Sequence, residues 1–391
     1  MIQEDIAIIG VGMTKFGKYP DVSLKELGGE AIVRALQDSG LDREDIDAAF
    51  MANAMGSIIT GQVSVVGQNV LRANAFNAIP VFNVDNACAG SSSAFHLALH
   101  YIRSGAAETV LVVGIEKLVS ADRTRAYIAL NGAADVDFVA QSGIDASRES
   151  IFVSAIYPKR LDRYEAAYGL DANVLAQISV KNRQHARDNP YAQFTDPLTV
   201  DAVLASRRIV GPVTALMCAP IGDGASAVII TRRDHVRPSQ RPVWVRGSAV
   251  GMGSSPSETS SIARVAARAY KQAGLAPSDI DVAEVHDSIA FNELVAYEEL
   301  GFCAPGRGAA LVLEGATTLG GSLPVNPSGG LESRGHPVAA TGTAQILELA
   351  MQLRGEAGSR QVSGARIALA ENAGGFAMDD TAAIAVTILE A

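Results

Sequence analysis

The feature that most constrains the fold is an internal repeat. The sequence GLDREDID at residues 40–47 returns as GLAPSDID at residues 274–281. Each copy follows a stretch with apolar residues at helical spacing and precedes a short apolar strand candidate. The segment DGASAVII at residues 223–230 is matched in the same way by DDTAAIAV at residues 379–386. Because a solenoid has a much shorter period, these matches predict two homologous halves in one chain.

Strand and helix candidates alternate through the first half. Strands are predicted at residues 6–10, 48–52, 81–84 and 109–113, and helices at residues 24–39 and 94–103. The strand at 109–113 is a continuous run of β-branched residues and leucine, which is typical of a strand buried on both faces. This alternation predicts an α/β architecture in which helices cover a sheet.

The division into domains follows from the repeat. The chain has 391 residues, more than one ordinary core supports, so we expect more than one packed unit. We predict an N-terminal half of residues 1–116 plus 208–235 and a C-terminal half of residues 236–391. Residues 117–207 have no counterpart in the second half and contain the charged, tyrosine-rich stretch YPKRLDRYEAAYGL. They predict an inserted, mostly helical subdomain, which in α/β proteins commonly contributes to substrate sites.

Charge and composition exclude several classes of function. The formal net charge is −10, which argues against nucleic acid as the main partner. Cys88, Cys218 and Cys303 are too few for a disulfide framework, no Cys/His cluster indicates a metal site, and the last two are interpreted as structural. The first residues lack the basic flank of a signal peptide, and no apolar run is long enough to cross a bilayer. We therefore expect a cytoplasmic protein with no membrane partner and no permanently bound cofactor.

Two segments carry residues suited to nucleophilic catalysis. In NVDNACAGSSSAFHLAL, residues 83–99, Cys88 lies where a predicted strand gives way to a helix. The unpaired amides and the positive dipole end of a helix N-terminus favour a thiolate. In NPSGGLESRGHPVAATG, residues 326–342, a glycine-rich loop carries His336, whose imidazole can deprotonate a thiol and bind an oxyanion. Taken alone, each segment also fits an inert cysteine or a structural histidine.

Two further segments can support such chemistry. In EVHDSIAF, residues 284–291, His286 and Asp287 follow a strand candidate. The pair can present an oriented imidazole, or Asp287 can cap the following helix. In ALAENAGGF, residues 368–376, a strand runs into Gly374 and Gly375. Such a turn can aim backbone N–H groups at a carbonyl oxygen, or it can be a plain β-turn.

In this order, the four segments resemble the thiolase superfamily over essentially the whole chain. The chain looks like the sterol-carrier-protein-x type, because it has His286–Asp287 where ordinary thiolases have Asn-Glu. It also has Glu371–Asn372 where they have a catalytic cysteine. The resemblance implies the α/β thiolase fold, in which two homologous βαβαβαββ halves form a five-layer α-β-α-β-α sandwich with an inserted loop subdomain. It also implies a homodimer.

The resemblance assigns roles to the candidate residues. Cys88 would attack the acyl carbonyl after His336 has activated its thiol. The N–H groups of Cys88 and Gly374 would form the oxyanion hole of the acyl-enzyme, and His286 with His336 would hold the enolate oxygen of the other thioester. The implied reaction cleaves or forms the Cα–Cβ bond of a 3-oxoacyl-CoA, with CoA as cosubstrate, in the degradation of lipids or aromatic compounds.

One departure from the family pattern leaves the acid/base at the substrate's α-carbon open. The second cysteine of thiolases falls on Asn372, and the cysteine that many relatives of this branch place after the His–Asp pair falls on Ser288. Asn372 cannot serve at neutral pH, and a serine is a poor proton donor without a partner. Glu371 or His286 is therefore the remaining hypothesis.

The insertion and the family resemblance give expectations for CoA binding and for a protein partner. Lys159, Arg160 and Arg163 in the insertion are candidate ligands for the phosphates of CoA, with a solvated helix face as the alternative. Chains of this branch are often paired with a small zinc-ribbon/OB-fold protein, as in a benzoylsuccinyl-CoA thiolase type and in steroid side-chain aldolases. The resemblance is therefore compatible with such a heteromer as well as with a homodimer.

Two alternative functions stand beside the thiolase. The first is an aldolase or acyltransferase subunit that acts with the zinc-ribbon/OB-fold partner. The presence of Cys88 favours a thiolase over an aldolase, because an aldolase needs no acyl-enzyme. The second is a non-catalytic lipid or acyl-CoA binding protein, and the presence of Cys88, His286 and His336 together weighs against it.

Overall fold

A computed structural model of the protein describes residues 5–254, 260–377 and 380–391. Within these residues the main sheet has nine strands in the order β3-β2-β4-β7-β1-β8-β11-β10-β9. Their bounds are Ile6–Met13 (β1), Ala48–Ala52 (β2), Val81–Val84 (β3), Thr109–Glu116 (β4), Gly224–Arg232 (β7), Val243–Gly251 (β8), Val282–Glu284 (β9), Ile367–Ala377 (β10) and Asp380–Glu390 (β11). Strands β1 and β8 pair antiparallel and join the two halves.

The sheet order repeats on the two sides of this seam. Outward from the seam, the first half places its strands in the order β1, β7, β4, β2 and β3, and the second half places β8, β11, β10 and β9 in the corresponding positions. Where the first half has β3, the second half has only a single parallel bridge between Ala283 and Val325. The matching order confirms the two homologous halves.

The repeat also reappears in local geometry. Helix α1 (Leu24–Ser39) ends at Gly40 and helix α10 (Ser261–Ala273) ends at Gly274, with left-handed φ angles of 66° and 70°. The carboxylates of Asp47 and Asp281 then each accept two backbone N–H groups, at the starts of β4 and β10 respectively. The second repeated pair forms β7 and β11, although Asp379 lies outside the described residues.

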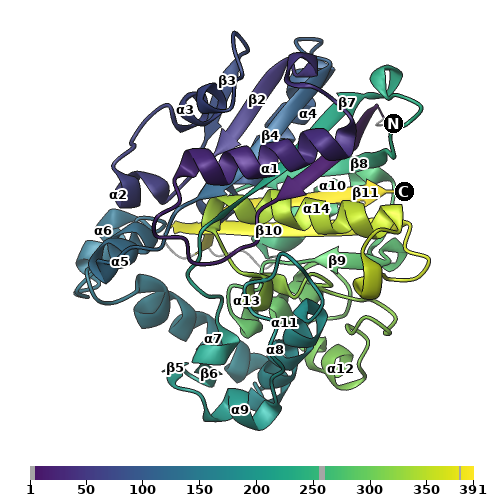
Figure 1. The fold of residues 1–391 in the computed structure, drawn as a ribbon. Coiled ribbons are helices and arrows are strands. Elements are labelled where there is room, and N and C mark those ends of the chain that lie inside the picture. Colours follow the sequence, from purple (N-terminus) through teal and green to yellow (C-terminus); the bar gives the residue numbers. More distant parts are fainter. Residues whose placement is uncertain (1–4, 255–259, 378–379) are drawn as a thin grey trace.

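The layers agree with the predicted five-layer sandwich (Figure 1). Helices α1 and α3 cover one face of the first half-sheet, α4 and α14 pack between the half-sheets, and α10 covers the far face of the second. Helix α14 is buried along most of its length, as expected for a helix between two sheets. The bounds of the helices outside the insertion are Gly56–Thr60 (α2), Val66–Ala73 (α3), Gly90–Arg103 (α4), Ala290–Glu299 (α11), Gly308–Leu313 (α12), Gly330–Arg334 (α13) and Thr341–Arg354 (α14).

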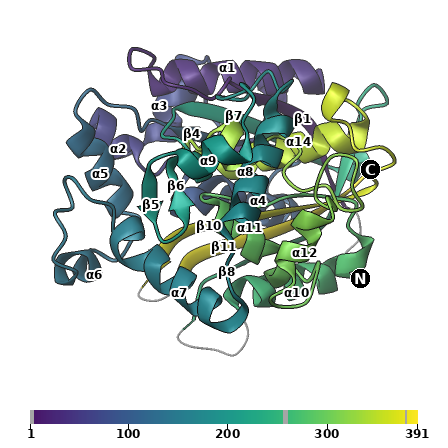
Figure 2. The same ribbon diagram turned by 90° about the horizontal axis from the view of Figure 1, so that it is seen from below.

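Residues 117–207 are mostly helical, as expected. They contain Arg123–Asn131 (α5), Val136–Gln141 (α6), Tyr157–Tyr168 (α7), Ala172–Ala186 (α8) and Val200–Ala205 (α9). A small hairpin of Arg208–Val210 (β5) and Val213–Thr214 (β6) follows. Helix α8 packs against α11, α12 and α13 of the second half. Figure 2 shows α8 beside α11 and α12, and Figure 1 shows α13 in the same region. The exact limits of the domains stay a prediction.

Three predicted elements differ at their ends. Strand β1 continues to Met13 rather than stopping at residue 10, because residues 11–13 still pair with β7. Strand β4 likewise pairs with β7 as far as Glu116. Helix α4 begins at Gly90, directly after the cysteine turn, rather than at residue 94. Among the described residues, no helix combines the length and the apolar character that a bilayer span requires.

Candidate active site

Cys88 lies on a tight turn between β3 and α4, within the short 3-10 helix Ala87–Ala89. Ala87 adopts a left-handed φ of 48°, which is uncommon for a residue with a Cβ. Its backbone N–H donates to the carboxylate of Asp85 at 2.9 Å, which supports this conformation. The turn places a partly accessible thiol at the N-terminal end of α4, as predicted.

Strand β10 passes directly behind this turn, and Gly374 marks the closest approach. A Cβ at Gly374 would lie 2.4 Å from the carbonyl oxygen of Asn86 and 2.5 Å from the nitrogen of Ala89, so only glycine fits. The next residue, Gly375, lines the cavity and donates its backbone N–H to the sulfur of Cys88. The oxyanion role of Gly374 stays a prediction, and Gly375 offers a second N–H at the same place.

His336 lies in the loop between α13 and α14, and Thr341 determines which nitrogen of its imidazole ring carries the proton. Nδ1 of His336 is 2.7 Å from Oγ1 of Thr341, and this hydroxyl donates to the carbonyl of Pro337 at 3.5 Å. Because the hydroxyl proton is directed to that carbonyl, the hydroxyl oxygen accepts the Nδ1 proton. This tautomer leaves a lone pair on Nε2, which can take a proton from a thiol.

His286 follows β9 and is tied to β10 through its main chain. Its backbone N–H donates to Oε2 of Glu371 at 2.9 Å. The side chain is 6% exposed, and its Nδ1 has no hydrogen-bond partner within the described residues. An unpaired polar atom in such a buried position is costly, so the ring retains capacity to bind a ligand.

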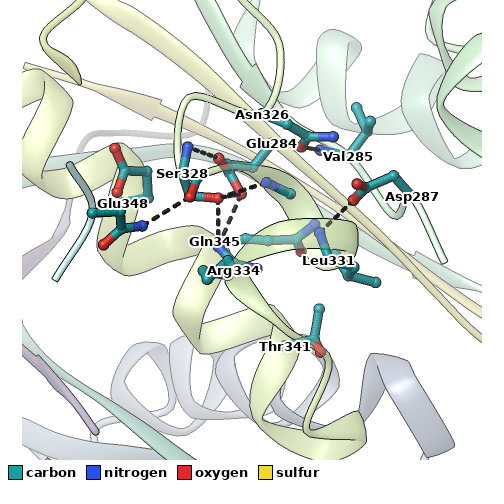
Figure 3. Close-up of polar contacts among 12 residues, drawn as sticks. Glu284, Val285, Asp287, Asn326, Ser328, Leu331, Arg334, Thr341, Gln345 and Glu348 are labelled. Carbon is teal, nitrogen blue, oxygen red and sulfur yellow. Dashed lines mark hydrogen bonds and ion pairs between the residues drawn. The ribbon is translucent and has the colours of Figure 1, made fainter. Parts of the chain in front are cut away.

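Asp287 does not orient the imidazole of His286. Its Oδ1 accepts the backbone N–H of Leu331 at 2.7 Å, at the start of α13 (Figure 3). Gly330 makes this contact possible, since it has a φ of 60° and a Cβ there would lie 2.2 Å from the carboxylate. The expected capping of the following helix is therefore wrong, since α11 has no side-chain cap; Asp287 binds the start of α13 instead, the helix that precedes the His336 loop.

The structure brings Cys88, His286 and His336 into one cluster. The cysteine sulfur and one nitrogen from each ring all lie within 4.8 Å of one another. The two imidazole rings meet edge to face, with centroids 5.1 Å apart and an angle of 79° between their planes. The cluster needs both halves of the chain, because the thiol comes from the first half and both rings come from the second.

Burial controls the protonation of the thiol. It raises the pKa of Cys88 to about 12, and the nearby carboxylates of Glu116 and Asp85 act in the same direction. The backbone N–H of Gly375 lowers the pKa but only partly offsets burial. Burial outweighs the stabilisation of a thiolate that is expected from the helix N-terminus, so the raised pKa favours the protonated thiol in the resting protein.

Burial also keeps both histidines neutral. It lowers the pKa of His286 to about 3, helped by the positive charges of Arg160 and Arg334. It lowers the pKa of His336 well below its ordinary value, helped by His286 and Arg334. Neutral rings can accept a proton at any physiological pH, so His336 is available as a base.

A buried ion pair joins Glu284, two residues before His286, to Arg334, two residues before His336 (Figure 3). Nη1 of Arg334 is 2.9 Å from Oε2 of Glu284, and Ser328 donates its N–H and its hydroxyl to the same carboxylate at 3.0 and 2.8 Å. Burial raises the pKa of Glu284 to about 7, although Arg334 opposes this shift. Removing one partner would leave the other as an unpaired buried charge, which is costly. The ion pair therefore keeps the loops that carry the two histidines in their relative positions.

The three candidates for the second acid/base lie in different places. Glu371 is buried, with its carboxyl directed to the backbone of His286, and burial raises its pKa to about 7. Asn372 donates its side-chain N–H to α14 at 3.1 Å. Ser288 lines the cavity over the cluster, and its Oγ is 3.1 Å from Oη of Tyr157.

Sequence reasoning missed two residues of this cavity. Tyr157 belongs to the charged and tyrosine-rich stretch of the insertion, but nothing in the sequence showed that it reaches Ser288. Cys218 was interpreted as structural, yet it also lines the cavity and forms an isolated β-bridge with Ile289. Burial raises the pKa of Cys218 to about 12. No local motif indicates this position, because it depends on a contact between the two halves.

The structure separates the three basic residues predicted to bind CoA. All of them lie on α7, but only Arg160 lines the cavity. Lys159 and Arg163 are exposed, and Nζ of Lys159 lies 5.7 Å from the centre of the Phe138 ring. The CoA role of Lys159 and Arg163 stays a prediction, whereas Arg160 faces the catalytic cluster.

Comparisons of the sequence point to one family. The thiolase N-terminal domain model matches residues 6–204, and the thiolase C-terminal domain-like model matches residues 245–387. The acetyl-CoA acetyltransferase of Methanothermobacter thermautotrophicus is 37% identical over 95% of this chain and 96% of its own. Sterol carrier protein 2 of Bos taurus is 35% identical over 95% of this chain and 70% of its own. The benzoylsuccinyl-CoA thiolase subunit BbsB of Thauera aromatica is 32% identical over 96% of both.

Solved structures confirm the predicted fold. The Ltp2-ChsH2(DUF35) aldolase structure matches 100% of this chain and 99% of its own with a TM-score of 0.80 and 25% identity. Human mitochondrial 3-ketoacyl-CoA thiolase in complex with CoA matches 99% of this chain and 98% of its own with a TM-score of 0.74 and 17% identity, a likeness of fold alone. The named relatives also confirm the predicted acyltransferase class. With its two family domains, its duplicated halves and its Cys–His–His cluster, this chain belongs to the thiolase family.

Proposed function

We propose that this chain is a thiolase-type acyl-CoA C-acyltransferase that cleaves or forms the Cα–Cβ bond of a 3-oxoacyl-CoA. The observation that carries the proposal is the convergence of Cys88, His286 and His336, with reactive atoms within 4.8 Å of one another. A thiol beside a neutral imidazole is the arrangement that covalent acyl transfer requires. CoA is the cosubstrate, and the scheme needs no permanently bound cofactor.

The first step is attack by the sulfur of Cys88 on the 3-oxo carbon. Because the resting thiol is protonated, Nε2 of His336 takes its proton as the S–C bond forms. The new oxyanion accepts backbone N–H groups from the turn, those of Cys88 and of Gly374 or Gly375. The Cα–Cβ bond then breaks, and its electrons form the enolate of the departing thioester.

The enolate oxygen is held by the two imidazoles. His286 is neutral and donates one N–H, while His336 donates the proton that it took from the thiol. This arrangement stabilises the negative charge that develops on the oxygen as the bond breaks, so it acts on the transition state more than on the bound substrate. CoA then attacks the Cys88 thioester, releases the shortened acyl-CoA and restores the thiol.

For the proton that reaches the α-carbon, we propose Ser288. Nδ2 of Asn292 donates to Oγ of Ser288 at 2.7 Å, so the serine proton is free to be given away. The hydroxyl of Tyr157 at 3.1 Å is the partner that a serine needs in order to recover it. Glu371 and Asn372 are better placed as supports, because their side chains bind the main chain of His286 and helix α14.

The covalent step is tested by intact-protein mass spectrometry. Wild type and Cys88→Ala are mixed with a panel of acyl-CoA and 3-oxoacyl-CoA thioesters. We expect an acyl-sized mass gain on the wild type alone, and an adduct that survives in Cys88→Ala would refute the assignment of the nucleophile.

Solvent deuterium exchange at the α-carbon of acetyl-CoA tests the proton transfer that we assign to Ser288. Ser288→Ala should lose this exchange while still forming the acyl-enzyme, and unchanged exchange would reject Ser288.

A second candidate function is a subunit of an aldolase or acyltransferase that acts with a small zinc-ribbon/OB-fold protein. The observation in its favour is the match of the whole chain to the Ltp2-ChsH2(DUF35) aldolase structure. An aldolase has no use for an acyl-enzyme, so the mass gain on Cys88 separates the two functions. Purification from the native host shows whether such a partner travels with the chain or whether it forms the predicted homodimer alone.

A further inference from the structure

One cation of the catalytic cavity has no partner in the described part of the chain. Arg160 projects from α7 into the cavity that Cys88, His286 and Ser288 also line. Its side chain is half-buried, and no hydrogen bond or ion pair joins its guanidinium to any described residue. A guanidinium that has lost part of its hydration without gaining a partner is poised to bind an anion brought by a ligand.

The acids that face Arg160 do not neutralise it by contact. Its charge acts on the buried carboxyls of Glu299 and Glu371, but neither forms an ion pair with it. Burial raises the pKa of both groups, to about 7 for Glu371, despite the opposing effect of Arg160. Part of the Glu371 population is therefore neutral at physiological pH, and the guanidinium retains a net attraction for an incoming anion.

The position of Arg160 also excludes the phosphates of CoA as its ligand. Its side chain lines the same cavity as Cys88, His286 and His336, and its charge contributes to lowering the pKa of His286. When the sulfur of CoA is at Cys88, the phosphates lie at the far end of the pantetheine arm. The anion that Arg160 meets must therefore belong to the part of the substrate that occupies the cavity itself.

The other walls of this cavity are largely apolar. They include Phe152, Val153, Ile156 and Phe376, and the cavity volume is about 220 Å³. Apolar walls with one guanidinium among the described lining residues select a carbon chain that ends in a carboxylate.

We propose that Arg160 binds a carboxylate carried by the acyl chain, so that the substrates are 3-oxoacyl-CoA thioesters with an anionic end. This assignment rests on the proposed thiolase function and adds its substrate class. The planar guanidinium matches a carboxylate through two parallel N–H bonds, which also fixes the position of the chain. The 3-oxo carbon is thereby held over Cys88.

The test compares two thioesters that differ only at this end. 3-Oxoadipyl-CoA carries a carboxylate where 3-oxohexanoyl-CoA carries a methyl group. We expect the wild type to favour the anionic thioester by at least about 100-fold in kcat/KM, because the apolar competitor leaves the cation unpaired. Arg160→Gln should abolish this preference and Arg160→Lys should keep part of it. Glu165→Gln, an exposed change on the same helix, should leave it intact.

The possible outcomes test the substrate class and the thiolase reaction separately. If wild type shows no preference, or if Arg160→Gln slows both thioesters equally, the carboxylate assignment is overturned. Acylation of Cys88 by 3-oxohexanoyl-CoA, read by mass, would show that the thiolase function stands even so. If neither thioester acylates Cys88, both proposals fail. If a thermal melt shows that Arg160→Gln is unfolded, the carboxylate assignment is judged from the wild-type preference and from its partial retention in Arg160→Lys.

Discussion

The substitution Gly374→Ala tests how closely β10 supports the nucleophile. The added Cβ would lie 2.4 Å from the Asn86 carbonyl oxygen and 2.5 Å from the Ala89 nitrogen, where ordinary contact begins at 3.4 Å. Both atoms belong to backbone on either side of Cys88, so no flexible side chain can yield. The strand and the turn must separate by about 1 Å.

The size of the effect follows from this displacement. A misplacement of about 1 Å at a reacting group lowers the rate by about 100-fold, which corresponds to about 2.7 kcal/mol of barrier. The crowding should also cost about 1–3 kcal/mol of folding stability. The backbone N–H of residue 374 survives the change, so the loss would come from geometry and not from a missing donor.

The assay is the single-turnover rate of Cys88 acylation, with the free energy of unfolding measured in parallel. Gly320→Ala is the matched control, because a Cβ at Gly320 meets nothing within 4 Å. We expect the control to be within about twofold of wild type. A folded Gly374→Ala protein with an acylation rate within about threefold of wild type would show that β10 does not set the position of the thiol.

Three further predictions concern the groups around the thiol. Thr341→Val removes the acceptor of the His336 Nδ1 proton and should slow Cys88 acylation by about 10- to 100-fold without changing the melting temperature much, whereas unchanged acylation would reject the tautomer. Burial raises the folded pKa of Glu371 from 4.5 to about 7, so its stabilisation is complete below about pH 4.5 and is lost as the pH rises through about 7. Denaturant titrations of Glu371→Gln should therefore lack about 3 kcal/mol of this fall, and parallel wild-type and variant curves would contradict the shift. The sulfur and ring nitrogens within 4.8 Å of one another have the donor set of a zinc site, so micromolar Zn²⁺ should inhibit the enzyme and EDTA should restore it. Inhibition of acylation that EDTA leaves in place, or no inhibition at all, would argue against that binding mode.

The sequence was informative where a local signal coincided with a structural boundary. Helix α1 has the predicted bounds; in the structure, Ser23 and Glu26 form a capping box at its start, and Gly40 ends it in a left-handed conformation. The duplication was visible for a similar reason. Asp47 and Asp281 each bind the backbone at the start of a neighbouring strand in the sheet, β4 and β10, so the repeated residues have the same structural role in both halves.

The candidate site was only partly predictable, since much of it depends on contacts between distant segments. The resemblance placed Cys88 and the two histidines, but the protonated state of the thiol follows from burial, which no local motif reports. The contact of Glu371 with the main chain of His286 joins residues that are 85 positions apart. Cys218 gave no sign at all, because its place in the cavity depends on how the first half packs against the second.

The two central helices carry a consequence for how such a site can arise. Helices α4 and α14 occupy equivalent places in the two halves, and the short segments that lead into them, Ala87–Ala89 and Val338–Ala340, touch at the cavity. In a symmetric pair of separate, identical halves, any side chain at one helix start would also stand at the other. When the two halves are joined in one chain, their sequences can differ, so the two helix starts can carry different side chains. One helix start can then hold a thiol and the other an imidazole, so the division of labour between nucleophile and base depends on the covalent link between the copies.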